Sequence, residues 1–280
     1  MQHGRCLCGD VEWTAEGPLE RMTHCHCSRC RKAHGTPFAT YAFAPGAGFR
    51  LRGAENVTRY ATSPAFVRGF CGRCGSVLPS AALDGRLAVP IGSLTTDPGV
   101  RPVAHVFVAS KLPWYEITDG LPQHAAFEPD EDAPVLDDLP APPVPTGRRG
   151  SCLCGEVRFV LEGTPLTARN CHCSRCRLAR SAAHAANVVT KQDAVRITQG
   201  ADRIASYKIP DARFFTQTFC RTCGGKVPRY DADRGIVVTP LGAFDDAPGT
   251  RPEMHMFAAS KAPWFAITDD LPQHAAGVPL

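Results

Sequence analysis

The stretch Cys25-His26-Cys27-Ser28-Arg29-Cys30 decides how this chain folds, and it recurs as Cys171-His172-Cys173-Ser174-Arg175-Cys176. In an extended backbone the first two cysteines of each stretch point to one side and the histidine between them to the other. A turn at the Ser-Arg pair can then bring the third cysteine back. Three converging thiolates bind a soft or borderline metal such as Zn²⁺, whereas cysteines this close cannot all form disulfides without strain. We therefore predict one metal site at each stretch.

The motifs around these stretches indicate a tandem duplication. Cys6-Leu7-Cys8-Gly9 and the three-cysteine stretch both recur 146 residues later, and Phe70-Cys71-Gly72-Arg73-Cys74-Gly75 recurs 149 residues later. The segment 101–126 recurs as 251–276. The order of motifs is the same in both copies, so we predict one architecture twice: a first domain at 1–127, an acidic and proline-rich linker at 128–147, and a second domain at 148–280.

Each copy contains seven cysteines in groups of two, three and two. A structural zinc takes four ligands in a closed tetrahedron, and the simplest partition joins the two outer pairs. This predicts two four-cysteine sites, formed by Cys6, Cys8, Cys71 and Cys74 and by Cys152, Cys154, Cys220 and Cys223. The remaining cysteines form two three-cysteine sites, Cys25, Cys27 and Cys30 and then Cys171, Cys173 and Cys176. We expect two zinc ions per domain and four per chain.

Three protein ligands and one exchangeable position are typical of a catalytic zinc. The recurring His26 and His172 should point away from the metal. His34 follows the first stretch, but the matching residue in the second copy is Arg180. We favour an open position over closure by a histidine or another neighbouring side chain, and we assign no catalytic residue beyond the open zinc sites.

Basic residues follow the first three-cysteine stretch. Arg31 and Lys32 can bind the carboxylates of an anionic thiol substrate, and a solvated basic face is the alternative that the sequence leaves open. Leu178 replaces Lys32 in the second copy. We therefore expect substrate to dock at the first copy, and the second copy to be the more structural half.

Composition indicates a globular chain with little affinity for polyanions. Of 280 residues, 44% are hydrophobic and 21% charged, and the net charge is only +4, so we do not expect nucleic-acid binding. Short apolar runs bounded by glycine, proline or aspartate predict a mainly β fold. There is no apolar run of about 18 residues, so we expect no membrane span. We see no secretory leader, and fourteen cysteines then fit a cytoplasmic metalloprotein.

Together, these motifs resemble the glutathione-dependent formaldehyde-activating enzyme family, whose domain is shared with centromere protein V. The matching motifs are Gly4–Gly9, Cys25–Lys32, Phe70–Gly75 and Ser110–Trp114. The resemblance implies two zinc-stabilised Mss4-like domains of small antiparallel sheets. It also implies one zinc at the outer cysteine pairs and a second at the central triplet. Glutathione, or a similar anionic thiol, would dock near the triplet and add to formaldehyde, giving S-hydroxymethylglutathione.

The resemblance therefore predicts a zinc-dependent carbon–sulfur lyase-type enzyme acting on glutathione adducts. The alternative is a non-catalytic zinc-binding scaffold or interaction protein, and the degree of closure of the triplet sites distinguishes the two. Two similar halves in one chain can also pack against each other as a pseudo-dimer, which the sequence leaves open.

Overall fold

The structure is a computed structural model, and it describes residues 1–64, 66–82, 85–128 and 148–278. Within these residues the chain is mainly β, with several small sheets and two short α-helices, as the sequence predicts. The predicted linker at 128–147 lies outside the described residues except for Glu128. Both domain boundaries therefore stay predictions. Below, the first half means residues up to 128 and the second half those from 148.

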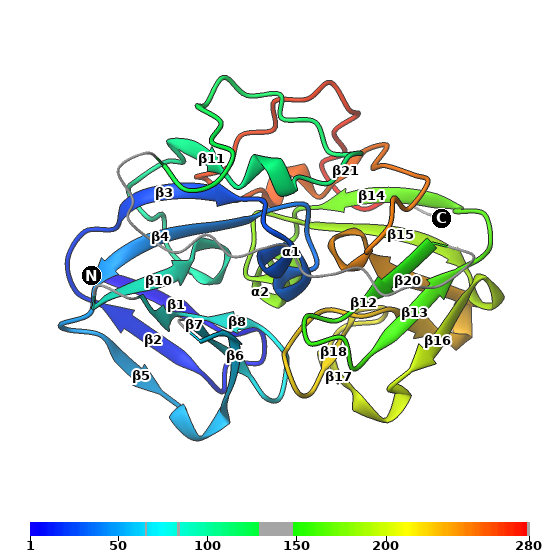
Figure 1. Cartoon of the computed structure of the whole chain (residues 1–280), viewed down its shortest axis with the longest axis horizontal. Coiled ribbons are helices and arrows are strands. Elements are labelled where there is room, and N and C mark those ends of the chain that lie inside the picture. Colours follow the sequence, from blue (N-terminus) through cyan, green and yellow to red (C-terminus); the bar gives the residue numbers. More distant parts are fainter. Residues whose placement is uncertain (65, 83–84, 129–147, 279–280) are drawn as a thin grey trace.

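The first half contains three sheets (Figure 1). The largest has the order β11 (Ala104–Val106), β3 (Glu20–Cys25), β4 (Ala39–Pro45), β10 (Arg86–Pro90) and β9 (Ser80–Ala81). A second sheet joins β1 (Gln2–Arg5), β2 (Glu12–Ala15) and β5 (Arg50–Arg52). A third joins β6 (Val57–Ser63), β7 (Phe66–Cys71) and β8 (Val77–Leu78).

The second half repeats this plan (Figure 1). Its largest sheet has the order β19 (Arg229–Asp231), β20 (Ile236–Pro240), β15 (Ala185–Lys191), β14 (Thr167–Cys171) and β21 (His255–Met256). The smaller sheets are β12 (Arg148–Ser151), β13 (Arg158–Leu161) and β16 (Val195–Gln199), and β17 (Ile204–Lys208) with β18 (Thr216–Cys220). The strand pairs are antiparallel except β3 with β11 and β14 with β21, which are parallel and were not expected.

Both α-helices start directly behind a cysteine pair and meet near the centre of the molecule (Figure 1). Helix α1 is Ser28–His34 and α2 is Ser174–Arg180, and the thiols of Cys27 and Cys173 cap their N-termini. Helix α1 contacts the 3-10 turn η7 (Leu241–Ala243) of the second half, and α2 contacts η2 (Ile91–Ser93) of the first. A Cβ on Gly242 or Gly92 would lie 2.4 or 1.9 Å from backbone nitrogen, so each crossing requires glycine.

The cores of the two halves exchange tryptophans. Trp264 is 3% exposed and packs into the hydrophobic cluster around Trp13 in the first half. Trp114 is partly buried and packs against the cluster around Phe159 in the second half. Each tryptophan therefore anchors the core of the other half. The tail loops that carry them lie side by side at the top of Figure 1, joined by a 2.6 Å hydrogen bond between Thr118 and Thr268.

Further 3-10 turns connect the strands: η1 (Ala54–Asn56), η3 (Val108–Ser110), η4 (Gln192–Ala194), η5 (Ala201–Arg203), η6 (Ala232–Arg234) and η8 (Ala258–Ser260). No helix in the described ranges is both long and apolar enough to cross a membrane.

Candidate functional site

The outer cysteine pairs come together in each half as predicted. We call Cys6, Cys8, Cys71 and Cys74 the first knuckle, and Cys152, Cys154, Cys220 and Cys223 the second. The four sulfurs of each knuckle lie within 4.8 Å of one another. Individual separations are 3.6 Å from Cys8 to Cys71 and 3.8 Å from Cys154 to Cys220. A tetrahedral zinc with Zn–S bonds of about 2.3 Å needs sulfurs about 3.8 Å apart, so both knuckles fit this metal.

Local backbone geometry builds each knuckle from two tight turns. In the first, the Val11 amide donates to the Cys6 sulfur at 3.3 Å. Gly75, in the left-handed region at φ +75°, donates to the Cys71 carbonyl at 2.8 Å. The second knuckle repeats both contacts with Val157 and Gly224. Hydrogen bonds among neighbouring thiols lower the pKa of Cys74 and of Cys220 and raise the pKa of Cys8 and of Cys223, so the cysteines of each knuckle differ in how readily they form the thiolate that a metal binds.

The central cysteines also converge, at the C-terminal ends of β3 and β14 and the starts of α1 and α2. We call Cys25, Cys27 and Cys30 the first triplet, and Cys171, Cys173 and Cys176 the second. The sulfurs of each triplet lie within 4.8 Å of one another. Hydrogen bonds from Cys171 and then Cys176 lower the pKa of Cys173 to about 3. Three convergent sulfurs, one of them a thiolate at neutral pH, fit three ligands of a zinc ion.

The histidine inside each triplet points away from the sulfurs, as predicted. His26 Nε2 lies 2.8 Å from His105 Nδ1, and His105 Nε2 lies 3.0 Å from Asp119. His172, His255 and Asp269 repeat this chain at 2.7 and 3.0 Å. Burial lowers the pKa of His26 to about 3, so its ring is neutral and stays a hydrogen-bonding group.

These histidine–aspartate chains fix the triplet loops, and sequence reasoning missed their two carboxylates. The only available signal was that the segment Ile117-Thr118-Asp119 recurs as 267–269.

Arg31 and Lys32, the predicted substrate contacts, lie inside the molecule. Lys32 is 3% exposed, and its ammonium lies 2.5 Å from Asp245 of the second half and 2.8 Å from the Ser151 hydroxyl. Arg31 is 8% exposed and donates to the His26 carbonyl at 3.1 Å. A substrate role for either residue stays a prediction, and these contacts give both residues a structural role.

The first triplet is closed on one side by a buried arginine. Arg68 on β7 is 7% exposed and donates to the Cys30 sulfur at 3.1 Å and to the Tyr41 hydroxyl at 2.8 Å. The same hydroxyl lies 2.8 Å from His34 Nε2. The ring of Phe66 lies 5.1 Å from the guanidinium carbon. Arg68 thus sits where a ligand approaching Cys30 from the β7 side would bind.

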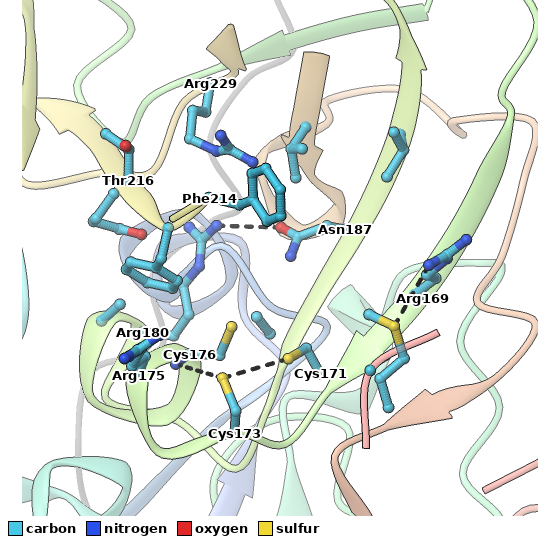
Figure 2. A pocket seen from close by; sticks show the side chains of 18 of the residues that line it. Arg169, Cys171, Cys173, Arg175, Cys176, Arg180, Asn187, Phe214, Thr216 and Arg229 are labelled. Carbon is cyan, nitrogen blue, oxygen red and sulfur yellow. Dashed lines mark hydrogen bonds between the residues drawn. The ribbon is translucent and has the colours of Figure 1, made fainter. Parts of the chain in front are cut away.

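A cavity of about 610 Å³ adjoins the second triplet (Figure 2). This volume lies within the range of about 300–1,000 Å³ usual for small-molecule sites. All three cysteines of the second triplet line it, together with apolar side chains such as Phe214 and six arginines: Arg169, Arg175, Arg180, Arg213, Arg229 and Arg234. Among the residues that the structure describes, no aspartate or glutamate lines it. Substrate docking was expected at the first copy, and this cavity lies in the second.

The basic residues of this cavity lie on several elements that sequence reasoning did not connect. In Figure 2, Arg180 on α2 reaches Asn187 on β15, with Nη2 and Oδ1 separated by 3.2 Å. Burial lowers the pKa of Arg180 to about 10, which still leaves it charged at neutral pH. The sequence signal was the replacement of His34 by Arg180, which carried no meaning before its neighbours were known.

Comparisons with known proteins agree with the cysteine arrangement. The family model of the glutathione-dependent formaldehyde-activating enzyme matches residues 1–110 and 147–260. A Schizosaccharomyces pombe protein named as an uncharacterized lyase is 31% identical over 83 residues, which are 30% of this chain and 59% of that protein. A crystal structure of a Rhodobacter sphaeroides protein from a structural-genomics programme is 25% identical, with a TM-score of 0.29, over 37% of this chain and 91% of that one. With the family model matching both halves, this chain belongs to the glutathione-dependent formaldehyde-activating enzyme family.

Proposed function

We propose that the chain is a zinc-dependent, carbon–sulfur lyase-type enzyme that forms or cleaves S-hydroxymethylglutathione, or a closely related glutathione adduct. The observation that carries the proposal is a three-sulfur site beside an arginine-lined cavity, in a chain of this family. We propose four zinc ions per chain, one at each knuckle and one at each triplet. The knuckle ions would stabilise the fold.

In the addition direction, the glutathione sulfur forms a bond to the formaldehyde carbon, and the carbonyl oxygen takes up the proton that the thiol releases. Zinc held by a triplet would lower the pKa of a thiol at its fourth position and favour the thiolate at neutral pH. Arginine side chains in a cavity wall can pair with the two glutathione carboxylates and orient the sulfur towards the triplet. The apolar walls exclude water and strengthen these ion pairs.

The alternative, a non-catalytic zinc scaffold, draws on different contacts. Arg68 closes one side of the first triplet. Hydrogen bonds also join the two halves, such as Ser76 Oγ to the Leu178 carbonyl at 2.9 Å and Ser181 Oγ to the Val77 carbonyl at 2.8 Å. We propose that the halves form a pseudo-dimer on this basis.

We also propose that the protein is located in the cytoplasm, because clusters of free thiols persist in a reducing compartment.

The test measures zinc content and glutathione exchange in the same purified protein. We expect four zinc ions per folded chain by elemental analysis. Two-dimensional exchange NMR of a glutathione–formaldehyde mixture should show faster interconversion of glutathione and S-hydroxymethylglutathione when the protein is added. The uncatalysed rate, measured in the same buffer, is the control. Unchanged exchange with all four metals present would favour the scaffold.

A further inference from the structure

The two triplets have matched cysteines but unmatched surroundings, and this difference bears on where a substrate binds. We infer that glutathione, as a thiol carrying carboxylates, binds at the second triplet alone, and that Arg68 makes the first triplet a closed structural site. The choice of glutathione rests on the proposed function. The assignment to one half rests on the contacts described next.

Three replacements distinguish the walls of the two triplets. Gln217 occupies the position of Arg68, Asn187 that of Tyr41, and Arg180 that of His34. In the first half, Arg68 and Tyr41 reach across the site and bond to each other beside Cys30. Glutamine and asparagine are shorter, and the cavity adjoins the triplet in the half that carries them.

Two buried donors in this cavity wall have no protein partner. Gln217 is 2% exposed and Arg180 is 8% exposed, and both line the cavity. Neither Gln217 Nε2 nor Arg180 Nη1 has a hydrogen-bond partner among the described residues. A buried donor without a partner destabilises the protein, so a ligand offering acceptor oxygens would gain by meeting these two. Carboxylate oxygens are such acceptors.

The charge of the cavity favours the same class of ligand. The first-half residues that match Arg169, Arg175, Arg180, Arg213 and Arg229 are Thr23, Arg29, His34, Pro64 and Ser80, so a single arginine is retained among the five. Asp231 pairs with Arg229 at 3.0 Å and with Arg234 at 2.6 Å, and it neutralises part of the charge. Arg180 and Arg175 form no ion pair with a carboxylate among the described residues. An excess of guanidinium groups over thiolates and carboxylates attracts and orients a dianion.

The experiment measures glutathione binding by calorimetry to the zinc-loaded full chain, with variants that exchange the two walls. Asn187→Tyr/Gln217→Arg gives the second triplet two of the three wall residues that distinguish the first, and we expect it to abolish binding. Tyr41→Asn/Arg68→Gln is the matched control and should retain wild-type affinity. S-methylglutathione should also bind more weakly to Asn187→Tyr/Gln217→Arg than to the wild-type protein. β-Mercaptoethanol, which has no carboxylate, should bind weakly to the wild-type protein and to both variants.

A milder pair of variants keeps the test decisive if the wall exchange prevents folding. Arg175 is exposed and lines the cavity, and Arg29 is its counterpart in the first half. We expect Arg175→Gln to weaken glutathione binding about fivefold, which corresponds to about 1 kcal/mol for an exposed ion pair, and Arg29→Gln to leave it unchanged.

Two results would overturn this assignment, and they differ in their meaning for the function. Binding that resists the second-half changes but is weakened by Arg29→Gln would place glutathione at the first triplet, with the proposed function intact. Zinc-loaded wild-type protein that binds no glutathione would overturn both the assignment and the function.

Discussion

The first and second triplets share cysteine spacing, a buried histidine pair and an N-capping thiol, yet one adjoins a buried Arg68 and the other a cavity of about 610 Å³. The difference arises from side chains on β4, β7 and the end of α1, and on β15, β18 and the end of α2, rather than from the cysteines themselves. On our proposal, holding a metal and admitting a ligand are separable properties of the same loop. Duplication allows one copy to keep the first property while the other combines both.

The largest expected effect is the loss of one knuckle cysteine. It tests whether the two knuckles, unlike the two triplets, contribute equally to zinc content and stability. Cys71→Ser and Cys220→Ser should each remove one of four zinc ions and destabilise the chain by about 5 kcal/mol or more, because metal binding contributes directly to folding. Elemental analysis and thermal unfolding measure both effects. A large effect in one half alone would show that the knuckles have diverged as the triplets have.

A smaller effect should come from the buried ion pair between Lys32 of the first half and Asp245 of the second. The matching residues, Leu178 and Thr95, cannot form such a pair. Lys32→Met leaves Asp245 buried without a cation and should cost about 3–5 kcal/mol in unfolding free energy. The control, Leu178→Met at the matching position in the second half, should cost less than about 1.5 kcal/mol. Urea denaturation gives both values, and Lys32→Met/Asp245→Asn should recover part of the loss. Equal costs for the two single variants would contradict the role assigned to Lys32.

The smallest expected effect concerns His184, which replaces Phe38 of the first half and is 4% exposed. Burial, and then the nearby His172, His255 and His24, hold the pKa of His184 well below 6.5, and neither ring nitrogen has a partner among the described residues. Folding therefore opposes its protonation, and stability should fall as the pH drops below 6.5. By pH 5.5 the loss should reach about 1.4 kcal/mol for this group.

The variant His184→Phe restores the first-half residue and should remove that part of the acid dependence. Urea denaturation of both proteins at pH 7.5 and 5.5 measures the difference. Identical pH dependence in the two proteins would show that His184 titrates freely in the folded chain.

Sequence spacing predicted the cysteine grouping because metal ligands must satisfy a local geometry. Cys6 and Cys8 are two residues apart, a spacing at which both sulfurs can bind the same tetrahedral zinc ion. Because each copy has seven cysteines, one group of four leaves a group of three. Short apolar runs bounded by glycine, proline or aspartate also predicted the mainly β fold. Parallel pairing of β3 with β11 could not be predicted, because nothing within either strand specifies its partner.

The surroundings of the triplets were beyond sequence reasoning for a related reason. Its place directly behind the triplet predicts Lys32 as a substrate contact, but its ion-pair partner Asp245 is 213 residues away and belongs to the other half. The arginines of the cavity lie on β14, α2, β19 and the segments before β18 and after β19, and only the fold brings them together. In the sequence they are isolated basic residues.

The buried pairing of Lys32 with Asp245 also determines what would happen if the chain were cut between its halves. The residue of the first half that corresponds to Asp245 is Thr95, and the residue of the second half that corresponds to Lys32 is Leu178. Two identical first halves, associated in the same way, would set an ammonium against a threonine, and two second halves would set a carboxylate against a leucine. Each half should therefore associate poorly with a second copy of itself and well with the other half. After this divergence, neither half alone can replace the fused chain as a homodimer.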